Sequence, residues 1–352
     1  MWLIDILIFL GVLSVLIISH EFGHFIVARR NGIKVEKFSI GFGPVVFKVK
    51  RRDTIFSICA IPLGGYVKLA GEDRASCRGR EDEFFSKPPG IRAKVIFAGP
   101  LFNYFLSFVI LWFLFIVGMP SLDTTVNEVV KNMPAHIGGI EKGDKIIEVN
   151  NREIKTWDDL RQEIGNSQGK IRITVLRKDR YLQFEMLPKE TETKDIFGRT
   201  IKSRKIGVYP SIITKRYNPL LALVKGAGYT LKLTFLIVKG FYYTFTGTLP
   251  IKEAVAGPVR LFEITSNVAQ QGVIALLNLV SLIGISLAII NLFPIPILDG
   301  GHLFLILLEK LRRRPLSEKA ESILTNIGIV IISAIMFFVF YNDIINIISR
   351  KK

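Results

Sequence analysis

Four long apolar runs divide the chain: Trp2 to Val27, Val95 to Val117, Val273 to Phe293 and Ile327 to Ile347. A helix needs about 20 mainly apolar residues to cross the hydrocarbon core of a bilayer, and each run meets that length. The first run has no basic flank and no convincing small-residue cleavage site, so we interpret it as a retained span rather than a signal peptide. The pattern predicts a polytopic α-helical membrane protein with four transmembrane helices, at 1–27, 95–117, 273–301 and 327–347.

Between the first two runs lies a polar region, 28–94, with strand-like alternation. Lys34 to Lys50 and Thr54 to Leu69 alternate apolar and polar residues, and Arg51-Arg52-Asp53 joins them. Alternation with period two is typical of a half-buried strand. We expect a membrane-associated β-hairpin on the cytoplasmic side.

The segment 122–190 has the composition of a soluble domain. It contains short β-branched runs at Ile171 to Leu176 and Tyr181 to Leu187, with turn signals at Gly143-Asp144 and Asn150-Asn151. These features predict a small α+β domain inserted between the second and third spans.

The apolar segment 217–247 differs from the four runs because it carries Lys225, Lys232 and Lys239. Lysines seven residues apart fall on one stripe of a helix. A helix with one cationic stripe is better placed in the interface plane than across the bilayer, so we expect an amphipathic interfacial helix here.

Composition supports a membrane protein: 49% of the residues are hydrophobic, and the mean hydropathy is positive. The formal net charge is +17. Basic clusters at Arg29-Arg30, Lys48 to Arg52 and Arg312 to Arg314 lie near the ends of apolar runs, as in cytoplasmic loops, so the expected partner is the lipid bilayer and not nucleic acid. The two cysteines lack CxxC spacing, which argues against a disulfide scaffold or a thiolate metal site.

The end of the first span contains an H-E-x-x-H motif, His20-Glu21-Phe22-Gly23-His24. Residues four apart share a helix face, so both imidazoles can reach one ion while Glu21 lies beside it as a general base. Ionisable groups are costly in a membrane span. The alternative is a cluster near a loop whose side chains extend to water.

Zinc hydrolases commonly use three protein ligands and a water, so a third ligand is needed. The best candidate is Asp299, in the segment Asn291 to Gly301. Two prolines break the helix there, and two glycines permit close approach. The alternative is an ordinary turn with Asp299 as a helix N-cap. For His302 we expect a structural role.

Topology brings the three ligands together. If the basic loops after the first span are cytoplasmic, two further crossings return Asp299 to the side of His20 and His24. A fifth span at 217–247 would separate them. The tail Arg350-Lys351-Lys352 does not follow this pattern, because four spans place it outside.

With these residues assembled, the chain resembles the site-2 protease family of intramembrane zinc metalloproteases, in its bacterial regulator-of-sigma-E protease branch with a single PDZ domain. The matching motifs are His20 to His24, Gly41-Phe42-Gly43-Pro44, Ile61 to Lys68, Ala98-Gly99-Pro100 with Asn103, Asn291 to Gly301, and, for the PDZ domain, Pro134-Ala135, Gly143 to Ile147, Val149-Asn150 and Trp157. The resemblance implies that His20, His24 and Asp299 hold Zn²⁺ and that Glu21 activates its water.

The resemblance also implies substrate-binding roles for Asn291 and for the hairpin at Gly41, Phe42 and Gly43. We expect Gly41 to Val46 to help unwind a substrate helix by β-augmentation; the alternative is a hairpin that only packs against the spans. The inserted domain either binds peptide termini or acts as a size filter.

The resulting hypothesis is a protease in the bacterial cytoplasmic (inner) membrane, with the PDZ domain extracytoplasmic and the active site toward the cytoplasmic half. Its expected substrates are transmembrane proteins, such as anti-sigma factors cleaved in regulated intramembrane proteolysis, and signal-peptide remnants. Two other functions stay open at this point: a membrane metal transporter and a non-catalytic membrane-tethered PDZ adaptor.

Overall fold

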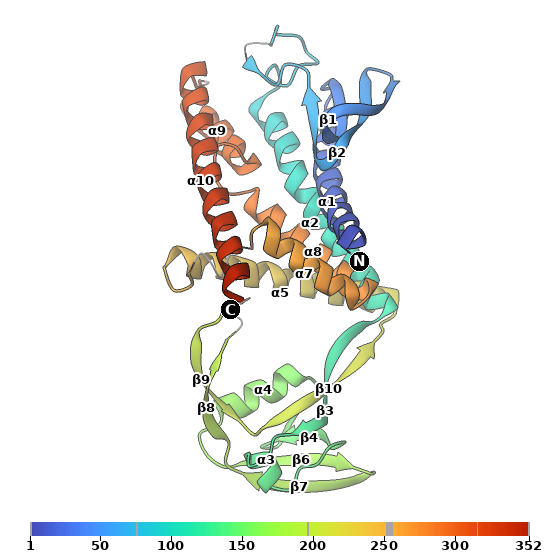
Figure 1. Ribbon diagram of the computed structural model, residues 1–352, viewed down its shortest axis with the longest axis vertical. Coiled ribbons are helices and arrows are strands. Elements are labelled where there is room, and N and C mark those ends of the chain that lie inside the picture. The colour runs from blue at the N-terminus through green and yellow to red at the C-terminus, as the bar shows by residue number, and fades with distance from the viewer. Residues whose placement is uncertain (1, 75–76, 196, 251–255, 315, 351–352) are drawn as a thin grey trace. The chain divides into compact units, whose positions relative to one another are not determined.

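The computed structural model describes residues 2–74, 77–195, 197–250, 256–314 and 316–350 (Figure 1). These residues form two compact units. The membrane unit comprises Met1–Leu114 and Pro219–Lys352, and the inserted unit comprises Phe115–Asn218.

The membrane unit is built mainly from helices. They are α1 (Trp2–Arg30), α2 (Pro89–Val117), α5 (Pro219–Phe245), α7 (Pro258–Gln270), α8 (Val273–Ile290), α9 (Asp299–Arg312) and α10 (Glu318–Arg350). Five of them, α1, α2, α5, α8 and α10, are long and apolar enough to cross a membrane. The chain is therefore a multi-pass helical membrane protein. Four of these helices, α1, α2, α8 and α10, overlap the predicted spans, although α8 ends at Ile290, before the predicted limit at 301. The pattern did not predict α7 or α9.

The fifth candidate span is α5, the segment with the lysine stripe. Within the membrane unit, α5 runs roughly horizontally in the view of Figure 1, whereas α1, α2 and α10 run roughly vertically. Length and composition alone permit a crossing, so the interfacial placement of α5 remains a prediction that its crosswise direction supports.

Small residues allow α2 to pack closely against α1 and α8. A Cβ atom on Gly23 would overlap the carbonyl oxygen of Ala98 on α2, and one on Gly284 of α8 would overlap the Ser107 hydroxyl. Such close approach is how transmembrane helices gain packing energy when lipid offers no hydrophobic driving force. Leu16, which is fully buried, packs between these helices.

The predicted hairpin has its two strands, β1 (Val35–Arg51) and β2 (Thr54–Leu69), but each strand bends back on itself. Phe38 pairs with both Phe56 and Val67, and Phe56 also pairs with Val49. The result is a sheet of four segments with residues 45–51 at one edge and 65–69 at the other. Glycines permit both bends: Gly41 and Gly43 in β1 adopt φ of +83° and +85°, and Gly64 in β2 adopts φ of +103°, which glycine tolerates at no steric cost.

The inserted unit is an α+β domain. Its strands are β3 (Met119–Val129), β4 (Lys145–Val149), β5 (Arg152–Glu153), β6 (Ile171–Arg177), β7 (Arg180–Met186), β8 (Lys189–Lys194), β9 (Thr200–Lys205) and β10 (Val208–Lys215), and its helices are α3 (Pro134–Ile137) and α4 (Trp157–Asn166). The main sheet has the order β10-β3-β4-β6-β7, with β5 beside β4. The unit extends beyond the predicted range 122–190 because β10 pairs with β3.

Candidate metal centre

Two histidines on α1 form one side of the site. His20 and His24 are one helical turn apart and share a face, as the spacing predicted. Their Nε2 atoms lie 3.2 Å from each other, and their rings meet edge to face with centroids 4.8 Å apart. Both nitrogens therefore converge on one point.

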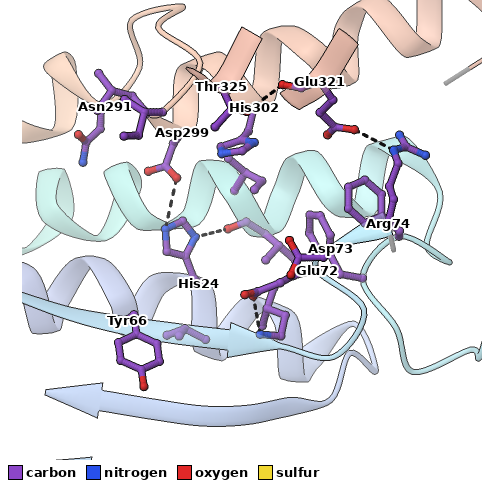
Figure 2. A pocket seen from close by; sticks show the side chains of 18 of the residues that line it. His24, Tyr66, Glu72, Asp73, Arg74, Asn291, Asp299, His302, Glu321 and Thr325 are labelled. Atoms are coloured by element: carbon purple, nitrogen blue, oxygen red, sulfur yellow. Dashed lines mark hydrogen bonds and ion pairs between the residues drawn. The ribbon is translucent and has the colours of Figure 1, made fainter. Parts of the chain in front are cut away.

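Asp299 completes the cluster from a different part of the chain. Its Oδ2 lies 3.1 Å from His20 Nε2, and its Oδ1 lies 3.5 Å from His24 Nε2. Figure 2 shows the Asp299 carboxylate directed at the imidazole of His24. Asp299 is the first residue of α9, and the N-cap is Leu298 without any side-chain capping bond. The alternative of Asp299 as an N-cap is therefore wrong.

The segment before α9 is irregular and tightly closed. The Gly300 N–H donates to the carbonyl of Asn291 at 2.6 Å. Cβ atoms on Gly300 and Gly301 would overlap the carbonyl oxygens of Leu292 and Ile295. Only glycine fits at both positions, and this close packing brings Asp299 toward α1.

The donor set fits zinc. Tetrahedral Zn²⁺ with bonds of 2.0–2.1 Å separates its ligand atoms by about 3.3 Å. His20 Nε2 lies 3.2 Å from His24 Nε2 and 3.1 Å from Asp299 Oδ2, whereas His24 Nε2 lies 3.5 Å from the other carboxylate oxygen, Oδ1. Oδ2 of Asp299 is buried and has no hydrogen-bond donor among the described residues. Two imidazole nitrogens and a carboxylate are ligands that a catalytic zinc site uses, with a fourth position open.

The second nitrogen of each imidazole also has a neighbour. His24 Nδ1 lies 2.8 Å from the carbonyl oxygen of Val95 on α2, so it donates its proton there and leaves the Nε2 lone pair free for a metal. The amide of Asn291 lies 3.5 Å from His20 Nδ1. By rotating, this amide can offer its oxygen to the Nδ1–H of His20. The role of Asn291 in binding substrate remains a prediction.

Gly99 on α2 is a site residue that the sequence reasoning did not single out. A Cβ atom there would overlap His24 Nε2 and would lie 2.7 Å from His20 Cε1. The Ala98-Gly99-Pro100 motif was visible, but only the packing shows that this glycine makes room for the two imidazoles.

A cavity of about 1030 Å³ adjoins the cluster and is lined by Glu21 and by residues of the 65–69 sheet edge. The backbone of Val67 hydrogen-bonds to the Glu21 carboxylate. Tyr66 also lines the cavity, as does His302 (Figure 2). The predicted substrate-binding residues Gly41, Phe42 and Gly43 do not line it; the Phe42 ring instead stacks on Tyr66, with centroids 6.1 Å apart.

Ion pairs close the far wall of this cavity. Arg74, in the loop after β2, pairs with Glu321 of α10 at 2.9 Å and with Glu309 of α9 at 3.3 Å. Figure 2 shows the Arg74–Glu321 pair at the end opposite Asp299. These contacts link the sheet region to the two helices that follow the metal ligand.

Comparison with known proteins identifies the family. The family described as "Peptidase family M50" matches residues 8–335. The chain belongs to peptidase family M50. It is therefore a multi-pass membrane protein and a zinc metalloprotease. This assignment excludes the alternatives of a metal transporter and a non-catalytic adaptor.

Similar proteins match nearly the whole chain. Cj1068 of Campylobacter jejuni, whose name assigns it as a zinc metalloprotease, is 33% identical over 344 residues, which cover 96% of this chain and 93% of that protein. The regulator of sigma-W protease RasP of Bacillus subtilis is 26% identical, and the match covers 98% of this chain and 99% of RasP. Among solved structures, the PDZ domain of the SdrC-like protein Lin2157 from Listeria innocua matches 25% of this chain and 92% of its own, at 18% identity and a TM-score of 0.20.

Proposed function

We propose that this M50 protease hydrolyses peptide bonds within transmembrane segments of membrane proteins. His20, His24 and Asp299 hold the zinc ion, and Glu21 is the general base. The single observation that carries the assignment is the convergence of two imidazole nitrogens on α1, a helix apolar enough to cross a membrane, with the Asp299 carboxylate at the start of α9.

Peptide hydrolysis at this site needs an activated water and a base. A zinc ion bound there acts as a Lewis acid and lowers the pKa of a water molecule toward neutrality. Glu21 follows His20 in the chain and faces the same cavity, so its carboxylate can take the proton and return it to the leaving amine. The backbone of Val67 holds the Glu21 carboxylate in place.

A transmembrane substrate arrives as a helix and must become extended before cleavage. The 65–69 edge of the sheet borders the cavity and offers backbone groups for strand addition. In this arrangement Gly41, Phe42 and Gly43 act through the stacking of Phe42 on Tyr66. Asn291, beside His20, is placed to bind the backbone of the same substrate strand.

The physiological role that fits is regulated intramembrane proteolysis. RasP is named as a regulator of sigma-W, which supports anti-sigma-like membrane proteins as substrates, with signal-peptide remnants as a second class. We assign the inserted unit as an extracytoplasmic PDZ domain and the active site to the cytoplasmic half of the inner membrane, with α5 in the interface. The positive-inside pattern of the basic loops supports this orientation.

The test is cleavage of a model transmembrane substrate by the purified chain. Glu21→Gln should retain one zinc ion per chain and lose activity at least about 100-fold, the usual scale for a general base. Asp5→Asn, on the same helix but far from the site, is the matched control. Wild-type cleavage by Glu21→Gln, or unchanged zinc content after replacing His20, His24 and Asp299 by alanine, would refute the assignment.

A further inference from the structure

A second cavity, of about 330 Å³, lies at the end of α1, away from the metal centre. Its lining includes three cations, Arg29, Lys34 and Arg52, and two acids, Asp53 and Asp82. None of these residues belongs to the proposed catalytic machinery.

The backbone around this cavity is firmly held. α1 ends in a glycine cap. Gly32 has φ of +69°, and the Ile33 N–H donates to the Ala28 carbonyl at 3.0 Å, a pattern that is common at helix C-termini. The Lys34 N–H donates to the Asp82 carbonyl at 2.9 Å. Arg29 and Lys34 therefore project from a closed turn.

The third cation comes from the turn of the sheet. Arg52 has φ of +55°, and the adjacent Thr54 hydroxyl donates to the Val35 carbonyl at 2.8 Å. This bond ties the β1–β2 turn to the strand that leaves α1. Three cations from two separate turns thus line one cavity in the protein without a ligand.

The charge of the cavity is not balanced internally. Among the described residues, Arg29, Lys34 and Arg52 form no ion pair, whereas the Asp82 carboxylate already lies 3.5 Å from Arg80. Asp53 is the one carboxylate of the lining without an ion pair in the described chain. Three clustered cations against one available carboxylate form a site for an anion with several acceptor oxygens, such as a phosphate.

The source of that phosphate follows from the neighbouring sheet edge. Val46, Phe47 and Val49 are 72%, 60% and 48% exposed; they alternate with Lys48 and Lys50 and precede Arg51 and Arg52. An apolar edge followed by arginines suits the boundary between acyl chains and headgroups, where basic side chains meet anionic lipid. A phospholipid offers both chemistries at once, whereas free phosphate offers only one.

We propose that this cavity binds the phosphate of an anionic phospholipid, with Arg29, Lys34 and Arg52 as its ligands and the 45–49 edge against the acyl chains. The lipid anchors the turn of the sheet to the end of α1. Because the opposite edge of this sheet lines the metal cavity, the bound lipid steadies the surface on which substrate is extended.

The experiment measures lipid retention by native mass spectrometry of the full chain, released from vesicles of phosphatidylglycerol and phosphatidylcholine. Wild type should retain phosphatidylglycerol preferentially. Lys34→Ala/Arg52→Ala should reduce its affinity roughly 25-fold, at about fivefold per cation, which corresponds to about 1 kcal/mol each. Asp53→Asn should increase retention. The matched control, Lys50→Ala/Lys94→Ala, removes two exposed charges that lie outside both the cavity lining and the 45–49 edge and should leave retention within about twofold of wild type.

Zinc content and helical circular dichroism confirm that each variant is folded. Equal losses in the two double variants would overturn the proposal, because they would show general attraction of a basic surface. Displacement of the lipid by millimolar inorganic phosphate, with no preference for phosphatidylglycerol, would overturn it in favour of a soluble phosphate. A decrease on Asp53→Asn would also contradict it.

Discussion

The Nδ1 atom of His24 lies 2.8 Å from the carbonyl oxygen of Val95. This contact joins α1 to α2 directly behind the metal-facing nitrogen and sets which ring nitrogen carries the proton. A ligand imidazole that donates its other N–H to a carbonyl is oriented and made more basic. α2 therefore contributes to the metal centre without supplying a ligand.

The first prediction concerns Gly99, the α2 residue that faces both imidazoles. Gly99→Ala should abolish zinc binding, because the added Cβ atom would overlap His24 Nε2. The chain should still insert and fold, since the change adds a single methyl group. Zinc content by atomic absorption is the measurement. Gly11→Ala, on α1 with open space around it, should keep full zinc content; a metal-loaded Gly99→Ala would contradict this geometry.

The second prediction separates the two edges of the sheet. Single prolines at 65, 66, 68 and 69 should reduce cleavage at least about tenfold while zinc stays bound, because proline removes an N–H that an added strand would need; Val67 is left unchanged because its backbone binds Glu21. Single prolines across 45–49 should have a smaller effect, since that edge does not border the metal cavity. The readout is kcat/KM on a model span. Equal sensitivity of both edges would refute strand addition at 65–69.

The third prediction concerns the stability of the inserted unit. Asp144 is fully buried, and Arg177 binds both its oxygens, at 2.6 and 2.8 Å. Arg177→Ala should lower the free energy of unfolding of this unit by about 3 kcal/mol, because it leaves a buried carboxylate unpaired. Thermal unfolding followed by Trp157 fluorescence, in a background without Trp2 and Trp112, measures this.

The control for that measurement is Arg180→Ala, which removes an exposed arginine from the adjacent strand. It should change stability by less than about 0.5 kcal/mol, as is usual for surface positions. Similar losses of stability in both variants would show that the buried Asp144–Arg177 pair contributes no more to stability than an exposed arginine does.

The fourth prediction is a pH dependence in the loop between β2 and α2. Burial raises the pKa of the Glu83 carboxyl, but hydrogen bonds from the Arg78 and Arg80 N–H groups, the Cys77 thiol and the Arg80 guanidinium outweigh it and lower the pKa from 4.5 to about 2. A lowered folded-state pKa stabilises the fold above pH about 4.5, and this stability is lost as pH falls toward 2.

Glu83→Gln should therefore lower the melting temperature at pH 6, and its difference from wild type should shrink steadily below pH 4.5. Differential scanning fluorimetry from pH 6 to pH 3 follows this trend. Glu81→Gln, an exposed neighbour, should show no such change. A Glu83→Gln difference that is constant with pH would exclude the predicted linkage.

The fifth prediction concerns α5. Single cysteines at Arg216 and Thr248, on either side of α5, should react with a membrane-impermeant maleimide from the same, extracytoplasmic side, in a Cys59→Ser/Cys77→Ser background. An Arg313→Cys variant should react only after permeabilisation. Labelling of the two flanking cysteines from opposite sides would instead make α5 a fifth span, as its length and hydropathy allow.

The sequence by itself predicted four of the five helices that are long and apolar enough to cross a membrane, the two strands and the His20–His24 pair, because each depends on local periodicity or on spacing within one helix. It could propose Asp299 only through topology and the family resemblance. Contacts between distant segments decided the rest.

Three features needed the tertiary structure. The doubled sheet depends on positive φ at Gly41 and Gly43 in β1 and at Gly64 in β2, and its 65–69 edge borders the cavity. The role of Gly99 depends on how closely α2 approaches α1. The separation between Asp299 and the histidines depends on the packing of Gly300 and Gly301. Periodicity predicts which face of a helix is apolar, but only the packed chain determines which atoms, hundreds of residues apart, reach bonding distance.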